Sequence, residues 1–295
     1  MTVVSALAGL RDLFTYPFMV NAFRAGTIVA VLSAALGWFM VLRRQTFAGH
    51  TLSLVGFPGA AGAVLLGVSP AIGFFGFCIV AGLIIGSPAP RAATVTYREE
   101  SALIGTVQAM ALACGFLFVS LYHGNLNGLT SLLFGSFLGI TAGQVTALLA
   151  VAAGALVALA VAARPLLFAS LDPEVATASG VPVRALGLGF LVLLGVAVAE
   201  TSQITGSLLV FALLVLPPAT AHVITGRPVL GVAISIVLAV AVTWAGLVVA
   251  YYTPYPTGAF ITTFSFGIYA VARGIKTIAS GSRAWRPRVA EVARP

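Results

Sequence analysis

Long apolar segments alternate with short polar ones along the whole chain. Nine apolar runs can be marked in the 295 residues, and most approach the about 20 residues that a helix needs to cross about 30 Å of hydrocarbon. The runs cover residues 23–42, 47–67, 70–87, 102–121, 143–163, 183–203, 206–223, 229–251 and 257–272. This pattern predicts an all-α integral membrane protein, a bundle of about nine transmembrane helices. Eight or ten spans are alternatives if a pair of half-helices re-enters locally.

The segments outside the runs divide the chain into three parts. Residues 1–22 are mixed in composition and lack a signal-peptide cleavage pattern, so we expect an interfacial segment that stays attached. Residues 23–272 form the predicted transmembrane domain, and residues 273–295 form a basic cytoplasmic tail. Its charge either holds the tail at the membrane or brings it into contact with an ATPase partner. The polar-then-apolar segment 122–142 predicts a re-entrant or interfacial helix on the outer side.

Positive charge indicates the orientation. If the nine spans alternate in direction, all Lys and Arg residues except Arg11 and Arg24 fall on one side. Cytoplasmic loops carry this excess, so the N-terminus is expected outside and the C-terminus inside.

Composition narrows the function classes. At 60% apolar and 7% charged residues, with a mean hydropathy of +1.10, a soluble fold is excluded. The net charge of +8 is scattered between apolar runs, which does not favour a nucleic-acid partner. Cys78 and Cys114 lie in apolar segments without metal-ligand spacing, so both are expected to be small core residues.

Enzyme motifs are missing from the sequence. The single lysine, Lys276, follows Ile275 where a phosphate-binding loop requires glycine, so this chain has no ATPase motif of that type. Asp12 and Asp172 both lie in aqueous segments, which excludes an intramembrane aspartyl pair. A GxSxG nucleophile turn is also missing. We therefore predict a protein that is not an enzyme and binds no cofactor stably.

Few ionisable side chains lie within the apolar runs. Glu200 is the only acid in one, and intramembrane acids are functional candidates. It could serve cation access or gating, or it could belong to a solvated or hydrogen-bonded outer rim. His50, near the start of the second run, is either a metal ligand or an interfacial structural residue; His123 and His222 are weaker candidates. A secondary transporter usually needs several intramembrane ionisable groups, so this small number disfavours that class.

Prolines, glycines and one polar loop mark further positions. Pro58 and Pro217-Pro218 lie inside runs and are expected to kink or break their helices. Gly82/Gly86 and Gly135/Gly139 have the small-xxx-small spacing of close helix packing. The loop around 168–182 predicts a short cytoplasmic helix, with Asp172 or Ser170 as its cap and Gly180 at its end.

Five separated segments, in order, resemble the permease subunits of metal-type ABC importers, the group of zinc, manganese and iron permeases. The segments are FMVNAFRAG, LGWFMVLRRQTFAGHTLSLVGFPGAAGA at 36–63, LLFGSFLGIT at 132–141, FASLDPEVATASGV at 168–181 and TGSLLVFALLVLPPATA at 205–221. The resemblance implies a homodimer in a bacterial plasma membrane. It also implies two partners, a cytoplasmic ABC ATPase and an extracytoplasmic metal-binding protein.

The resemblance also implies roles for individual residues. Asp172, Glu174, Ala176 and Gly180 match the family's ATPase-coupling loop. Pro58 and Gly59 match its Pro-Gly break, and Pro217, with Ala219 and Ala221, matches its late proline element.

One motif departs from the family. Many members resemble G-D-x-x-x-H-x-x-x-P-G in the second span, where Asp and His are associated with the cation path; here His50 and Leu54 occupy those places. Imidazole in place of carboxylate favours Zn²⁺ over Mn²⁺. His50 and Glu200 are therefore candidate pathway residues for a divalent metal, with zinc favoured. The lost second ligand leaves the alternative that no stable transmembrane site exists.

The sequence therefore predicts the permease of an ATP-driven divalent-metal importer, with zinc as transported substrate. An ABC permease for a metal chelate or cobalamin-like solute is the first alternative. A self-contained cation channel or secondary carrier, and a scaffold without transport, are the others.

Overall fold

The computed structural model describes residues 15–87, 97–122, 135, 139–207 and 210–284. Within these ranges the chain is helical, with short connections. The helices are α2 (Pro17–Leu42), α3 (Thr46–Leu65), α4 (Pro70–Gly86), α5 (Tyr97–Leu121), α7 (Ala142–Leu171), α8 (Pro173–Ala178), α9 (Val183–Thr205), α10 (Val210–Ile224), α11 (Pro228–Tyr251) and α12 (Thr257–Ala284).

Each of the nine predicted apolar runs is occupied by a helix, which confirms the predicted fold class. Seven of these helices are long and apolar enough to cross a membrane, namely α2, α3, α5, α7, α9, α11 and α12. The apolar helices α4 and α10 have only 17 and 15 residues. At 1.5 Å per residue α10 is about 22 Å long, which is less than the hydrocarbon thickness. The predicted run 206–223 is therefore not one full-length helix.

Two boundaries differ from the sequence prediction, and a third predicted segment is mostly not described. Helix α2 begins at Pro17, so the last residues of the predicted N-terminal segment belong to the first helix. Helix α12 continues to Ala284, which makes the start of the predicted basic tail helical. The predicted outer helix at 122–142 and His123 lie almost wholly outside the described residues.

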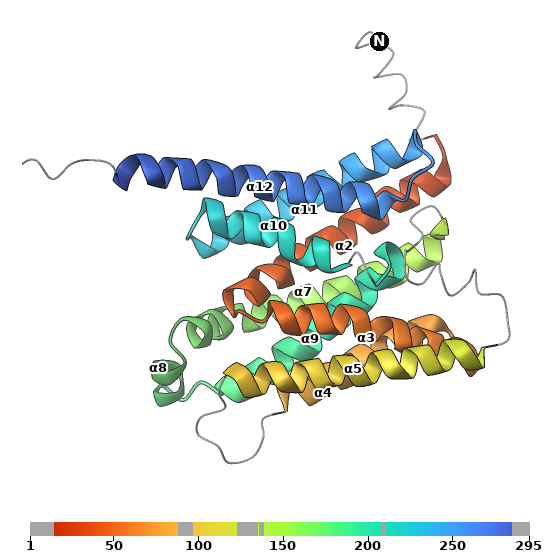
Figure 1. The fold of residues 1–295 in the computed structure, drawn as a ribbon, viewed down its shortest axis with the longest axis horizontal. Helices are drawn as coiled ribbons and strands as arrows, with labels where there is room; N and C mark the ends of the chain where they lie inside the picture. Colours follow the sequence, from red (N-terminus) through yellow and green to blue (C-terminus); the bar gives the residue numbers. More distant parts are fainter. Residues whose placement is uncertain (1–14, 88–96, 123–134, 136–138, 208–209, 285–295) are drawn as a thin grey trace, which may run out of the picture.

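Two groups of helices flank a central set (Figure 1). Helix α3 packs against α4 and α5 on one side, and α10, α11 and α12 pack together on the other. Helices α2, α7 and α9 contact one another and connect the groups, since α2 also packs against α10 and α11 and α9 against α4. Of the long helices, α2 and α3 are the most buried, and α5 and α12 are the least.

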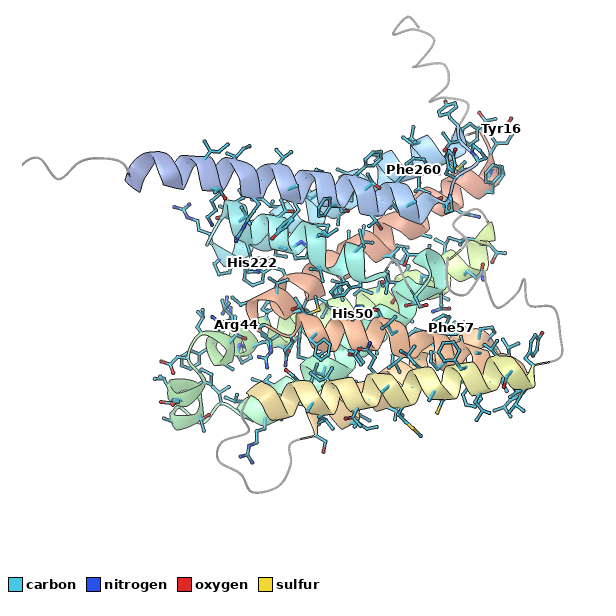
Figure 2. All side chains as sticks on the ribbon, viewed as in Figure 1. Tyr16, Arg44, His50, Phe57, His222 and Phe260 are labelled. Atoms are coloured by element: carbon cyan, nitrogen blue, oxygen red, sulfur yellow. The ribbon has the colours of Figure 1, made fainter. Side chains whose placement is uncertain are left out.

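The two ends of the bundle differ in chemistry. Arg44 and His222 lie towards the α8 end, and Tyr16 and Phe260 lie at the opposite end (Figure 2). At that opposite end Tyr16 contacts Phe18 and Tyr251, with ring centroids 5.6 and 6.5 Å apart. Aromatic belts are typical of membrane–water interfaces, and positive charge is typical of the cytoplasmic side. The direction of the spans across the membrane stays a prediction.

Glycines bring helix backbones into direct contact. A Cβ built on Gly82 would lie 2.8 Å from the Leu191 carbonyl oxygen, and one on Gly86 would lie 3.2 Å from the Leu188 Cα. This confirms the predicted close packing of the Gly82/Gly86 pair, here between α4 and α9 of one subunit. Gly59 of α3 and Gly73 of α4 pack in the same way, because a Cβ on Gly59 would overlap the Gly73 carbonyl oxygen.

The prolines do not break their helices. Pro58 lies inside the continuous helix α3, and Pro217 and Pro218 lie inside the continuous helix α10. Neighbouring helices accommodate them: Gly115 of α5 packs on Pro58, and Gly37 of α2 packs on Pro218. Both helices therefore continue without a break through residues that cannot donate a backbone hydrogen bond, and the kink, the other predicted effect, stays a prediction.

Candidate metal pathway and coupling helix

Helix α3 is largely buried but leaves one stripe partly open. The stripe consists of Phe47, His50, Leu54 and Phe57, whose spacing of three and four residues places them on one helix face. Phe47 is 39% exposed and the other three are half-buried. Positions 50 and 54, where the resemblance implies a metal motif, both belong to this α3 stripe. Figure 2 shows His50 and Phe57 at different levels along the same helix.

His50 carries a ring nitrogen that remains available. Its Nδ1 is buried and has no hydrogen-bond partner within the described part of the chain. The ring meets that of Phe211, at the start of α10, edge to face with centroids 4.8 Å apart. Ser53 Oγ donates to the His50 carbonyl oxygen at 2.6 Å, so this local contact leaves the imidazole free. His50 as a whole is half-buried, and an imidazole nitrogen without a hydrogen-bond partner can serve as a metal ligand.

His222 has a different environment. Its Nε2 lies 3.1 Å from the carbonyl oxygen of Trp38, and its ring stacks on the Trp38 indole with centroids 4.9 Å apart. Both contacts join α10 to α2. His222 is thus engaged in helix packing, which accords with the sequence prediction that it is a weaker metal candidate.

One chain contributes few ligands to the α3 stripe. Leu54 lies one turn from His50 and offers no donor atom. No group of three or more His, Cys, Asp or Glu side chains among the described residues could hold a metal ion. Tetrahedral zinc sites require three or four protein ligands. The described part of one subunit therefore forms no closed metal site.

Glu200 lies in a different part of the bundle. Its side chain is 0% exposed, and neither carboxylate oxygen has a hydrogen-bond partner among the described residues. Among the described residues the Glu200 carboxylate is therefore not hydrogen-bonded, and its role stays a prediction. Glu200 lines a cavity of about 300 Å³ between α4, α7, α9 and residues 139–140. We name this space the Glu200 cavity; its lining contains no residue of α3 or α10, the helices around His50.

Helix α8 has the predicted cap and turn. The Asp172 side chain accepts a hydrogen bond from the Val175 amide at 3.0 Å, and Pro173 occupies the first turn. Gly180 follows at φ +81°, a conformation that glycine adopts without steric cost. Ala176 is fully buried, whereas Glu174 is exposed. The short helix thus projects from the bundle end while anchored on one side (Figure 1).

Arg43 contacts residues of α7, of α9 and of the segment before α3, and the sequence analysis did not predict this. Its guanidinium donates to Ser170 Oγ at 3.1 Å and to Gln45 Oε1 at 3.2 Å, and it lies 5.4 Å from the ring centroid of Phe190. Ser170, proposed from sequence as an alternative cap for α8, instead lies in the last turn of α7. Arg43 therefore joins the segment before α8 to the residue that precedes α3.

Comparisons with known proteins agree over nearly the whole chain. The profile of the family described as "ABC 3 transport family" matches residues 15–275. A manganese transport system membrane protein of Halalkalibacterium halodurans is 27% identical over 261 residues, which cover 88% of each chain. A chelated iron transport system membrane protein of Yersinia pestis is 29% identical over 259 residues, 88% of this chain and 86% of that protein.

A solved structure has the same fold. It is described as PsaBC from Streptococcus pneumoniae in complex with Fab, and it superposes with a TM-score of 0.79 at 24% identity. The match covers 90% of this chain and 95% of that chain.

Proposed function

Because the chain belongs to the ABC 3 transport family, we propose that it imports a divalent transition-metal ion, with zinc favoured. The chain is a multi-pass plasma-membrane permease of the ABC-importer type and has no ATPase activity of its own. Hydrolysis of ATP comes from a partner subunit, and an extracytoplasmic metal-binding protein delivers the ion. The N-terminus lies outside and the C-terminus in the cytoplasm.

The open α3 stripe is the observation that carries the proposal. In a homodimer the stripes of two copies border a common route, and each supplies one imidazole from His50. Two imidazoles without a full ligand set bind an ion weakly enough for release, which transport requires. The unpaired Nδ1 of His50 supports this role. Leu54 makes the route poorer in ligands than the usual family motif.

The choice of zinc rests on ligand chemistry. Imidazole suits Zn²⁺, whereas Mn²⁺ prefers carboxylate and other oxygen ligands. The relatives are named for manganese or chelated iron, whereas His50 stands where the resemblance implies an Asp, and this imidazole is the basis for favouring zinc.

Coupling to ATP passes through α8. Asp172 and Gly180 define its ends, Ala176 anchors it and Glu174 presents a charge to the partner. A displacement of α8 reaches Ser170, and Arg43 transmits it to Gln45 at the start of α3. The ATPase thereby shifts the stripe between two states, because a ligand moves an equilibrium only through different affinities for its states.

A metal chelate is the second candidate substrate. The Yersinia pestis relative is named for chelated iron, and Leu54 and Phe57 make the stripe more apolar than a bare-ion path requires.

Reconstitution tests the proposal. The chain is assembled with its ATPase and binding protein in vesicles, and uptake of zinc, manganese and an iron chelate is followed with and without ATP. We expect zinc uptake that requires ATP and both partners. Manganese uptake alone would contradict the ligand argument, and chelate uptake without free-metal uptake would favour the second candidate. Flux through the chain alone would overturn the importer.

A further inference from the structure

The Glu200 cavity contains a buried acid that the proposed transport route does not use. The cavity lies where α4 and α7 begin and α9 ends, away from α8. Both oxygens of Glu200 are buried without a partner in the described residues. An ionised carboxylate in this position costs several kcal/mol unless something compensates its charge.

The other polar groups of the cavity are two glutamines. Gln203 Nε2 donates to the Ala199 carbonyl oxygen at 3.3 Å, which leaves its Oε1 free to coordinate. Gln144 Oε1 accepts from the Thr141 amide at 2.9 Å and from Thr141 Oγ1 at 3.2 Å, so its position is fixed by the α7 cap. Gln144 is exposed and marks the side on which the cavity is accessible.

The three helices that line the cavity, α4, α7 and α9, bring no positive side chain to Glu200. Helix α4 contains no Lys or Arg, and α9 contains only Arg184. Arg184 precedes Glu200 by 16 residues, about 24 Å along a helix. The basic residue of α7 is Arg164, which lies towards the opposite end of that helix from Gln144. An ionised Glu200 would therefore need a cation from outside these three helices.

The charge balance selects the kind of ion. One carboxylate neutralises one positive charge, whereas a divalent ion would leave an uncompensated charge in an apolar region. A volume of about 300 Å³ also accommodates an ion with several waters, since each water takes about 30 Å³. The end of α9 contributes the partial negative charge of a helix C-terminus, and the Thr141 cap satisfies the nearest amides of α7.

We propose that the Glu200 cavity is a binding site for a partly hydrated monovalent cation, Na⁺ or K⁺, coordinated by the Glu200 carboxylate and Gln203 Oε1. The ion connects α4, α7 and α9 and is distinct from the transported divalent metal. Its binding stabilises the folded chain in proportion to RT ln(1 + [ion]/Kd).

Thermal unfolding of the purified full-length chain in detergent tests this site. NaCl, KCl and choline chloride are compared at equal ionic strength, for the wild type, Glu200→Gln and Thr146→Val. Thr146 is exposed on α7, bonds only to the Ala142 carbonyl in the described structure and lies outside the cavity lining, so it is a matched control. We expect Na⁺ or K⁺ to raise Tm by about 2–4 °C over choline in the wild type and in Thr146→Val, and not in Glu200→Gln.

Three results would overturn the proposal. Equal Tm values in all three salts for the wild type would mean that a proton neutralises Glu200. A salt effect that persists in Glu200→Gln would place the ion elsewhere. If only Zn²⁺ or Mn²⁺ stabilised the chain through Glu200, this residue would be a ligand of the transported divalent metal. If Glu200→Gln does not fold, binding of ²²Na⁺ or ⁸⁶Rb⁺ is measured for the wild type and Gln203→Leu instead. Weaker binding in Gln203→Leu would support the site, and equal binding would overturn it.

Discussion

The α3 stripe and the Glu200 cavity place ionisable groups in opposite settings. His50 lies on a partly open helix face with one nitrogen unpaired, and its next neighbour on that face is apolar. Glu200 is fully buried beside a cavity and has amide groups near it. A side chain in a transport route must be accessible to ions that bind and leave again. A buried carboxylate instead retains the ion that neutralises its charge. The contrast separates a transport element from a structural one.

Leu54→His would sharpen this contrast most. Two histidines at i and i+4 lie on one helix face and can share a zinc ion. We expect the variant to bind Zn²⁺ about tenfold or more tightly, and to transport it more slowly because release is impaired. Equilibrium binding of zinc to the purified chain measures the first effect. Leu65→His, at the far end of α3, is the control. Unchanged affinity in Leu54→His would show that residues 50 and 54 do not face a common ion.

Gly59→Ala would break both regions together. The added Cβ would overlap the Gly73 carbonyl oxygen, and this contact joins α3, which carries the stripe, to α4, which lines the cavity. Overpacking of this type costs about 1–3 kcal/mol, so Tm should fall. Thermal unfolding of the purified chain measures the loss.

Gly76→Ala is the control for that substitution. Gly76 lies on α4, and no described atom outside its own helix turn lies within 4 Å of the position that an added methyl group would take. Tm should therefore be nearly unchanged. Equal Tm values for the two variants would contradict the close contact of α3 and α4.

Asp172→Ala should have the smallest effect, and it should leave both regions intact. Loss of an N-cap costs about 1 kcal/mol, which lowers the population of α8 roughly fivefold relative to its frayed form. We expect more ATP hydrolysed per ion transported and an unchanged Tm. Ser179→Ala, which removes an exposed hydroxyl at the other end of α8, is the control. A fall in Tm in Asp172→Ala would mean that the cap supports the bundle itself.

Local sequence signals predicted the elements well. The nine apolar runs and the α8 cap depend on residues close together in the chain, and the structure contains both. A kink or break was expected at Pro58, but α3 continues through this residue, and Gly115 of another helix packs against it. The short length of α10 was also missed, because the predicted run began at residue 206, whereas Gly206 and Ser207 lie outside the helix.

The surroundings of the candidate residues could not be read in the same way. Glu200 is followed by Thr201, Ser202 and Gln203, which suggested contact with water, yet α4 and α7 cover it. That burial depends on contacts between segments over 50 residues apart, which no local pattern records. Gln144 had a detectable signal, because Thr141 and Gln144 have the spacing of a capping box.

The rate of ATP-dependent zinc uptake in His50→Ala tests the central claim most directly. Wild-type and variant chains are assembled with the same ATPase and binding protein, and complexes with equal ATPase content are compared. If the α3 stripe is the transport route, the initial rate should fall roughly tenfold or more, while stabilisation by Na⁺ or K⁺ is retained. Zinc uptake at the wild-type rate in His50→Ala would contradict the account.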